Sequence, residues 1–314
     1  MPDKYIYLIF TALIIAALAV DVILLSKKDK VVTTRMALLE TVFWVSLSLG
    51  FCAFIWYEHG KADAIQYLSA YVLEWSLSMD NIFVFIIIFS FFKVKPSNHA
   101  RVLLLGILMA IVFRIIFIAV GSELITRFEW IMYVFGVFLL YTGFKMLLAK
   151  KEKEFNPEDN WAFRMMTKYL RTTNEEPEGH FFIKKNDKTY LTKLSMVVIM
   201  LGLIDIVFAV DSIPAVFSII PDPSKKLLIY SSNIFAVLGL RSLFFLLRGA
   251  AEKFAYLQHG ISVVLLFIGA KMIVAEWVHF PVWVSLIVIV VCIGSSILIS
   301  IIKSNQTRID NKGV

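Results

Sequence analysis

Runs of about 20 apolar residues, separated by short polar stretches, follow one another along almost the whole chain. A run of this length spans the hydrocarbon core of a bilayer as an α helix. The pattern predicts an all-α polytopic membrane protein with nine transmembrane helices, at about residues 5–25, 37–56, 65–92, 101–121, 129–149, 193–220, 226–247, 255–275 and 281–302. Little positive charge precedes the first run, so we expect a retained helix rather than a cleaved signal peptide.

The composition of the chain supports a membrane protein. Of its 314 residues 59% are hydrophobic and 18% are charged, and the mean hydropathy is +0.79. The net charge of +7 is typical of basic cytoplasmic loops in such a protein and does not indicate a nucleic-acid partner. Cys52 and Cys292 lie alone in apolar runs, so no disulfide framework is expected.

Basic residues fall unevenly between the two sets of loops. With the N-terminus outside, the inside segments hold 22 Lys and Arg residues and the outside segments hold five. Because positive residues accumulate in cytoplasmic loops, we expect the N-terminus outside and the C-terminus in the cytoplasm. The inside segments are then residues 26–35, 93–101, 150–193, 248–254 and the C-terminal tail.

The longest polar segment, residues 150–193, separates two groups of predicted helices. Within it, residues 178–191 predict a short β-hairpin that turns at Asn186-Asp187. Residues 159–170 have the pattern of a short amphipathic helix whose aromatic residues face the membrane surface, namely Trp161 and Tyr169. A solvated linker is the alternative for the whole segment.

One acidic motif occurs twice, 131 residues apart, inside apolar runs. Each copy has an acid, five further residues, an Asp, a small polar residue and an Ile. A carboxylate in hydrocarbon costs about 2.5–3.5 kcal/mol on insertion scales, so four of them need something that binds or neutralises them. The first copy supplies Glu74, Asp80 and Asn81, and the second copy supplies Asp205, Asp211 and Ser212.

The repeat extends beyond the acidic motifs. Arg114 follows the first motif at nearly the same distance as Arg241 follows the second. Further on, Lys145 in Tyr-Thr-Gly-Phe-Lys-Met corresponds to Lys271 in Phe-Ile-Gly-Ala-Lys-Met. The two pairs are the basic residues that lie inside the predicted helices, which makes a chance match hard to accept.

The repeat sets the predicted organisation of the chain. Residues 65–149 and 193–275 form the two copies, and because each copy has three helices the second is inverted in the membrane. Inverted repeats with polar residues near the midplane are typical of secondary transporters. The remaining parts are two peripheral helices in residues 1–64, a cytoplasmic loop at 150–192, and the last helix with its tail at 276–314.

The motif side chains offer carboxylate, amide and hydroxyl oxygens. This set suits Mg²⁺, Ca²⁺ or Mn²⁺, whereas all histidines lie in loops or near helix ends, which argues against zinc or copper. Glu74 and Asp80 are about 9 Å apart along a straight helix, so one small ion could not bind both. Either the helix unwinds, which Pro214 favours in the second copy, or each acid meets groups from the other repeat.

The basic residues of the repeats have two interpretations. As counter-ions, Arg114 and Arg241 would pair with the acids when the cation is absent; as oxyanion ligands they would bind a substrate bidentately. The first is favoured because acids outnumber arginines. Lys145 and Lys271 are expected to snorkel to the interface, and Glu40 either reaches the cavity or sits near the interface. Ion pairing that only holds the helices together is the alternative for the whole acidic set.

Three stretches resemble motifs of the TerC family of bacterial integral membrane proteins. They are Glu-Trp-Ser-Leu-Ser-Met-Asp-Asn-Ile-Phe-Val at 74–84, Phe-Ala-Val-Asp-Ser-Ile-Pro-Ala at 208–215 and Ser-Asn-Ile-Phe-Ala-Val-Leu-Gly-Leu-Arg-Ser-Leu at 232–243. The resemblance runs from about residue 35 to 302 and implies a relationship to LysE-type exporters. It implies a multi-pass protein of the bacterial inner membrane that acts in manganese efflux, in metal supply to exported proteins or in tellurite resistance.

The residues predict a transporter for a hard divalent cation, and the resemblance makes that cation Mn²⁺. Export would proceed by alternating access, with exchange for protons left open, and would need no cofactor. An enzyme is not expected, because no nucleophile and base motif accompanies the acids. Two alternatives stay open: a membrane anchor for a stress-resistance complex that docks through residues 150–193, and an oxyanion transporter. Expected partners are membrane lipid, the cation, and stress-complex proteins or further copies of the chain.

Overall fold

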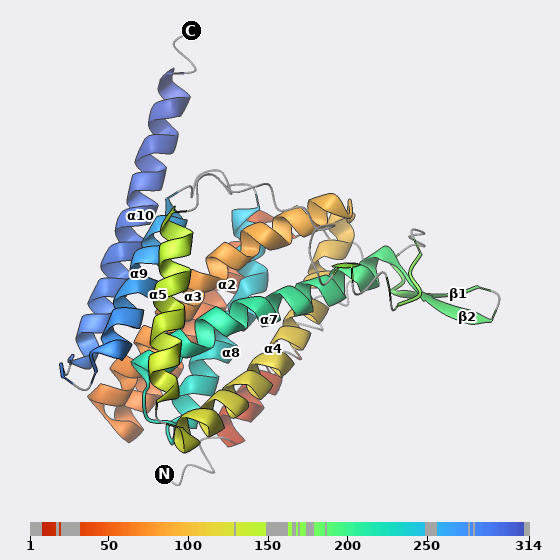
Figure 1. Cartoon of the computed structure of the whole chain (residues 1–314). Helices are drawn as coiled ribbons and strands as arrows, with labels where there is room; N and C mark the ends of the chain where they lie inside the picture. The colour runs from red at the N-terminus through yellow and green to blue at the C-terminus, as the bar shows by residue number, and fades with distance from the viewer. Residues whose placement is uncertain are drawn as a thin grey trace.

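The computed structural model is a bundle of long helices with one small hairpin (Figure 1). It describes residues 8–16, 19, 32–128, 130–148, 163–164, 168, 170–173, 179–185, 187–248, 256–275, 277–278 and 280–310. For Asp80, Phe83, Asp211, Val282 and residues 304–310 the description covers the backbone only.

The bundle helices coincide with the predicted apolar runs. They are α2 (Thr34–His59), α3 (Lys61–Phe91), α4 (Pro96–Arg127), α5 (Ile131–Leu148), α7 (Lys193–Ile219), α8 (Lys226–Leu247), α9 (Leu257–Ile273) and α10 (Val282–Asp310). Within the described ranges seven of them are long and apolar enough to cross a membrane, and α9 is apolar but has 17 residues. The all-α polytopic class is confirmed. The count of nine stays a prediction, since the first predicted helix is described only at residues 8–16 and 19.

Local sequence signals explain where several helices begin. The Thr33 side chain accepts a hydrogen bond from the Met36 N–H group (3.3 Å) and caps α2. Gly60 lies between α2 and α3 with φ 92°, a backbone conformation that side chains disfavour. Pro96 occupies the first turn of α4, where its missing N–H group costs nothing.

Pro214 does not interrupt α7. The helix is continuous from Lys193 to Ile219, so the unwinding that this proline was expected to cause is wrong. A helix-interior proline removes one backbone hydrogen bond. The residues that follow it, Ala215, Val216 and Phe217, are fully buried, and their packing holds the helix together across the missing bond. Because α3 is also continuous, any meeting of the acids must occur between helices.

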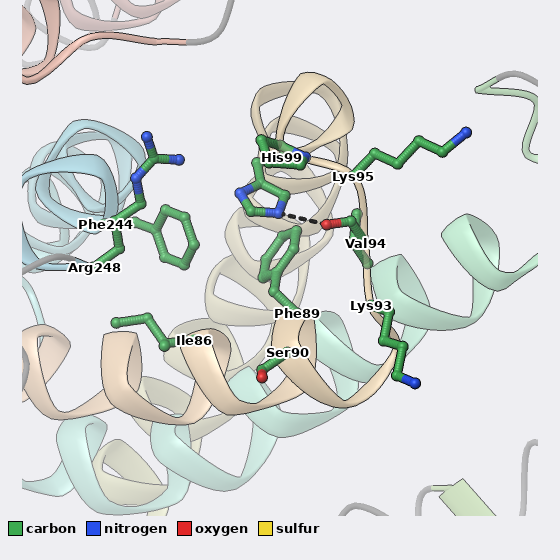
Figure 2. A pocket seen from close by; sticks show the side chains of 10 residues that line it. Ile86, Phe89, Ser90, Lys93, Val94, Lys95, His99, Phe244 and Arg248 are labelled. Carbon is green, nitrogen blue, oxygen red and sulfur yellow. Dashed lines mark hydrogen bonds between the residues drawn. The ribbon is translucent and has the colours of Figure 1, made fainter.

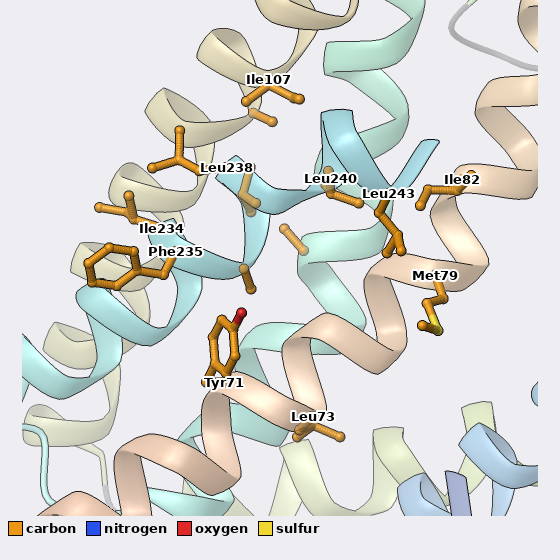
Figure 3. Packing of buried hydrophobic residues seen from close by; sticks show 14 of the residues in the cluster. Tyr71, Leu73, Met79, Ile82, Ile107, Ile234, Phe235, Leu238, Leu240 and Leu243 are labelled. Carbon is orange, nitrogen blue, oxygen red and sulfur yellow. The ribbon is translucent and has the colours of Figure 1, made fainter. Parts of the chain in front are cut away.

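Helix α8 forms the centre of the bundle, and nearly all of its residues are buried. It packs against α2, α3 and α4, while α4 also packs against α7, and α10 covers α3 and α9. Figure 3 shows the apolar contact of α3 with α8, in which Tyr71 and Leu73 lie below Phe235 and Leu240. This arrangement encloses the middle of α3, α4 and α7, where the polar residues of both motifs lie.

Glycines allow α5 and α9 to cross closely. A Cβ atom on Gly269 would lie 2.8 Å from the Gly136 carbonyl oxygen and 2.9 Å from the Leu140 nitrogen. A Cβ atom on Gly143 would lie 2.9 Å from the Leu266 side chain. Any larger residue at these positions would therefore push the two helices apart.

The predicted β-hairpin is confirmed. Strand β1 (Phe182–Lys185) pairs antiparallel with β2 (Lys188–Leu191), with Lys185 opposite Lys188. Asp187 in the turn has φ 55°, which Asp tolerates better than most residues. The hairpin extends away from the helices (Figure 1). Of the amphipathic helix expected at 159–170, only residues 163–164, 168 and 170 are described. Trp161 and Tyr169 lie outside the described residues.

The described loops gather at two ends of the bundle. At one end Arg248 donates to the Val32 carbonyl (3.5 Å) and Arg101 donates to the Gly179 carbonyl (3.4 Å), which joins segments predicted to be inside. At the other end, segments predicted to be outside line a cavity of about 800 Å³, with residues such as Gln66, Trp130, Pro221 and Ala275. Loops predicted to share one side of the membrane thus lie at the same end of the bundle. Which end faces the cytoplasm stays a prediction.

Candidate ion-binding site

Arg114 of α4 joins the two copies of the acidic motif. Its Nε and Nη2 groups donate to the two carboxylate oxygens of Asp205 in α7, at 3.1 and 3.2 Å. Its Nη1 group donates to Glu74 in α3 and, at 3.2 Å, to the side-chain oxygen of Asn233 in α8. One guanidinium thus connects four helices, and the bond to Asp205 has the bidentate geometry that fixes orientation as well as charge.

This cluster is closed to solvent. The exposed fraction is 1% for Arg114 and zero for Glu74, Asp205 and Asn233. Asn233 is itself held in place, because its Nδ2 group donates to the Ile229 carbonyl (3.0 Å) and its oxygen faces the arginine. Two carboxylates surround one guanidinium, so the cluster carries an excess negative charge when all three groups are ionised. An excess charge in the buried interior of the protein is costly unless a further cation or a proton compensates it.

Several buried oxygens near the motifs have no described hydrogen-bond partner. They are the second carboxylate oxygen of Glu74 and the hydroxyl oxygens of Ser78 and Ser212. Ser78 lies one helical turn after Glu74, so the two side chains share a face of α3. A buried polar atom that bonds to nothing costs about 1–3 kcal/mol. All these atoms are oxygen, the ligand atom that hard cations prefer.

Arg241, which corresponds to Arg114 in the second repeat, has a different neighbour. Its Nη2 group donates to Glu40 of α2 at 3.0 Å. The exposed fractions of the two side chains are 4% and 21%, so this pair is less enclosed by protein than the Arg114 cluster is. Glu40 therefore faces into the helix bundle and bonds a repeat residue.

The two repeat lysines also differ. Lys271 donates to the Ser218 carbonyl (3.2 Å) and the Ser285 hydroxyl (3.0 Å), and it lines the 800 Å³ cavity. Lys145 lies 6.0 Å from the centre of the Tyr141 ring, one turn earlier on α5. Neither bonds an acid of the motifs in the described part of the chain.

The sequence comparisons agree on one family. The model described as "Integral membrane protein TerC family" matches residues 59–308. The chain belongs to the TerC family. All the candidate residues except Glu40 fall within the TerC match.

Curated relatives of this TerC-family chain match over nearly its full length. It is 43% identical to "Uncharacterized membrane protein STKORF319" of Myxococcus xanthus over 297 residues, which cover 95% of this chain and 92% of the relative. It is also 43% identical to "Putative membrane-bound redox modulator Alx" of Escherichia coli K12 over 286 residues, 88% of each chain. An uncharacterized membrane protein of Rickettsia bellii is 37% identical over 299 residues. No solved structure matches the chain.

The structure brings together some of the predicted site residues. Glu74 and Asp205 meet at Arg114, and Asn81 and Ser212 are buried. The side chains of Asp80 and Asp211 lie outside the described set. Among the side chains that are described, no group of three or more His, Cys, Asp or Glu residues could hold a metal ion. The ligand roles therefore stay predictions.

Sequence reasoning missed Asn233. It lies in the third TerC motif, eight residues before Arg241, but no role was assigned to it. A polar amide inside an otherwise apolar run was the available signal, since buried amides are rare without a partner. Its partner, Arg114, could not be named, because the two residues are 119 positions apart and lie on different helices.

Proposed function

We propose that this protein transports a hard divalent cation, Mn²⁺ by its family resemblance, across the bacterial inner membrane in the direction of export. One observation carries the proposal: an acid from each repeat bonds the same buried arginine, and the oxygens around it have bonding capacity left over. A site shared by two repeats can open to one side or the other as the repeats move, which is what alternating access requires.

Packing at the α5–α9 crossing supports an inverted repeat. In the sequence alignment Gly143 corresponds to Gly269, and Leu140 corresponds to Leu266. Gly143 approaches Leu266, and Gly269 approaches Leu140. Each contact is therefore the counterpart of the other, with the first repeat and the second repeat swapped. Likewise α3 packs on α8 as α7 packs on α4. A two-fold relation between the copies would produce both pairs of contacts.

The balance of charge favours a cation over an oxyanion. The candidate site residues on α2, α3, α4, α7 and α8 include two arginines, Arg114 and Arg241, against five acids, which are Glu40, Glu74, Asp80, Asp205 and Asp211. A divalent cation would reduce this negative excess, whereas an oxyanion would increase it. The oxygen donors also match Mn²⁺, Mg²⁺ or Ca²⁺ and do not match thiophilic metals.

Arg114 acts in this mechanism as a counter-ion that competes with the transported cation. When the site is empty, the guanidinium neutralises Glu74 and Asp205, so the two repeats are held together. A cation that binds the motif oxygens weakens these ion pairs and frees the repeats to move. Protons that bind the carboxylates on the return step would serve the same purpose, and this would exchange the cation for H⁺.

The outer cavity provides the exit path. It has a volume of about 800 Å³, lies at the end predicted to face outside, and is lined by polar groups of Gln66, Thr126, Ser218 and Lys271. A cation released toward this cavity would meet water and the positive charge of Lys271. That charge disfavours rebinding of a cation and so favours release.

A membrane anchor is the second candidate function. The hairpin supports it, because β1 and β2 extend away from the helices (Figure 1) and Phe182 is 62% exposed. Exposed aromatic residues are enriched at docking surfaces. Removal of residues 182–191 would abolish an anchoring function, whereas neutral replacement of the motif acids would abolish transport only.

Inverted membrane vesicles loaded with a manganese-sensitive dye test the transport function. Wild-type vesicles should take up external Mn²⁺, and Glu74→Gln or Asp205→Asn should lower the rate by about tenfold or more, because hydrogen bonds to charged groups contribute about 1.5–3 kcal/mol each. Glu123→Gln is the matched control, since this acid of α4 is 58% exposed and pairs only locally with Arg127. Equal uptake by all variants, at equal protein levels, would contradict the proposal.

A further inference from the structure

A cavity of about 440 Å³ lies where α3 ends, α4 begins and α8 ends (Figure 2). It lies at the end of the bundle opposite the 800 Å³ cavity, and none of the motif acids lines it. The lining residues are Ile86, Phe89, Ser90, Lys93, Val94, Lys95, Pro96, His99, Phe244 and Arg248. Nothing in the proposed transport mechanism uses this cavity.

The charges around the cavity are positive. Lys93, Lys95 and Arg248 line it, and none of the described residues that line it is acidic. None of the three forms an ion pair with a described carboxylate. Arg248 instead lies over the Phe245 ring at 5.2 Å and makes a long hydrogen bond to the Val32 carbonyl. Three uncompensated cations at one cavity attract an anion.

The start of α4 adds one feature that suits an anion. The helix begins at Pro96 with no side-chain cap, so the positive end of its dipole faces the cavity. His99 donates from Nε2 to the Val94 carbonyl at 2.9 Å, which fixes the hydrogen on that nitrogen. Its Nδ1 atom is buried and has no described hydrogen-bond partner. With its hydrogen on Nε2, the His99 ring offers an acceptor at Nδ1, which can bond a hydroxyl group of a ligand but not the anion itself.

The opposite wall of the cavity is apolar. Ile86, Phe89 and Phe244 form it, with the Phe89 ring 4.6 Å from the His99 ring and the Phe244 ring 6.0 Å from it. Figure 2 shows Lys93 and Lys95 extending away from His99, so their aliphatic stems face the cavity and their ammonium groups lie on its rim. Such a wall gives no advantage to a free inorganic anion but would bury the glycerol and acyl carbons of a lipid.

We propose that this cavity binds the phosphate headgroup of an anionic phospholipid. Arg248 holds the phosphate beside Phe244, the flexible Lys93 and Lys95 side chains attract it from the opposite rim, and Ile86 and Phe244 contact the upper part of the acyl chains. Basic cavities between transmembrane helices near the cytoplasmic face are general sites for such headgroups. The lipid would join the α3–α4 turn of the first repeat to the end of α8 in the second, and so would stabilise one arrangement of the two repeats.

Native mass spectrometry of the purified full chain tests this site. We would add phosphatidylglycerol or phosphatidylcholine and count the lipids that stay bound. Wild type should retain phosphatidylglycerol in preference to phosphatidylcholine. The triple variant Lys93→Gln, Lys95→Gln, Arg248→Gln should bind phosphatidylglycerol on the order of 100-fold more weakly, since each basic residue contributes about fivefold. Ser90→Trp, which fills the cavity and keeps its charges, should also lose the lipid.

The matched control removes three charges from the same end of the protein. The control variant combines Lys184→Gln, Lys188→Gln and Arg171→Gln. The three native side chains are exposed and do not line the cavity. Phosphatidylglycerol binding should therefore be unchanged in this variant. Equal weakening in the control would overturn the proposal in favour of non-specific attraction. Displacement of the lipid by inorganic phosphate at a similar concentration would overturn it in favour of a free-phosphate site. A melting temperature measured for each variant identifies any that fails to fold, and Ser90→Trp then decides the test.

Discussion

Arg114 and Arg241 occupy corresponding positions in the two repeats, yet their surroundings differ. Arg114 is enclosed by Glu74, Asp205 and Asn233, so it bonds residues of both repeats. Arg241 bonds Glu40, which belongs to neither repeat. The difference teaches that the added helix α2 gives Arg241 an acidic partner from outside the repeats, whereas Arg114 bonds an acid from each repeat.

Helix α10 has a comparable effect. Lys271 of the second repeat donates to Ser285 of α10, whereas Lys145 of the first repeat lies beside Tyr141 of its own helix. Both added helices, α2 and α10, thus supply a polar partner to a basic residue of the second repeat. We infer that these helices, predicted to be peripheral, make the two halves unequal at the site.

The largest difference should appear when each arginine is neutralised. Arg114→Gln leaves two fully buried carboxylates without their counter-ion, so the free energy of unfolding should fall by about 3–5 kcal/mol. Arg241→Gln should cost about 1–2 kcal/mol, because Glu40 is less enclosed by protein than Glu74 and Asp205 are. Thermal unfolding in detergent measures both variants. Equal losses would contradict the distinction between the two arginines.

Transport should separate the same two clusters. Asp205→Asn should lower the rate of Mn²⁺ uptake by about tenfold or more, whereas Glu40→Gln should lower it by about threefold or less, because Glu40 belongs to neither repeat and bonds Arg241 rather than Arg114. Initial rates in dye-loaded inverted vesicles give the ratio. A greater loss of uptake in Glu40→Gln than in Asp205→Asn would mean that Arg241, rather than Arg114, is the arginine that transport requires.

The α5–α9 crossing offers a smaller comparison between the repeats. Gly269→Ala places a methyl group against the backbone of Gly136 and Leu140, which cannot yield, and should cost about 1–3 kcal/mol. Gly143→Ala meets the Leu266 side chain first and its backbone nitrogen only at 3.1 Å, so it should cost less. Melting temperatures of the two variants make the comparison. A greater loss for Gly143→Ala would mean that the two helices are not held at the distances described.

The smallest effect is expected at the surface of the first repeat. Arg127 and Glu123 form an ion pair in which both side chains are more than half exposed. Arg127→Gln should change the free energy of unfolding by at most about 1 kcal/mol, since solvent screens such pairs. The change should shrink further in high salt, which a melting curve at two ionic strengths would measure.

Much of the fold could be predicted because it follows from local pattern. The apolar runs predicted the bundle helices, although α4 and α10 extend six and eight residues beyond their predicted ends, and the pattern around Asn186-Asp187 predicted the hairpin. The continuity of α7 was predicted wrongly, because the effect of Pro214 depends on how tightly its neighbours pack, and the sequence does not display packing.

The candidate site was predictable in its residue types and less so in its contacts. The repeat identified the acids and the arginines, and charge favoured pairing between them. It did not reveal that one arginine serves both acids, nor that Asn233 completes the cluster, nor that Arg241 bonds Glu40. These contacts join residues 40 to 201 positions apart, and only the three-dimensional packing of the helices brings them together.

The central claim is that Arg114 and the transported cation compete for the same acids. The most direct test is the shift in melting temperature that Mn²⁺ causes in purified wild type, Arg114→Gln and Arg241→Gln. A ligand that binds the native state raises the melting temperature according to its affinity. Competition predicts the largest shift for Arg114→Gln, because Glu74 and Asp205 then have no guanidinium partner and can bind the cation. Wild type and Arg241→Gln should show a smaller shift. No shift in Arg114→Gln, alongside a clear shift in wild type, would contradict it.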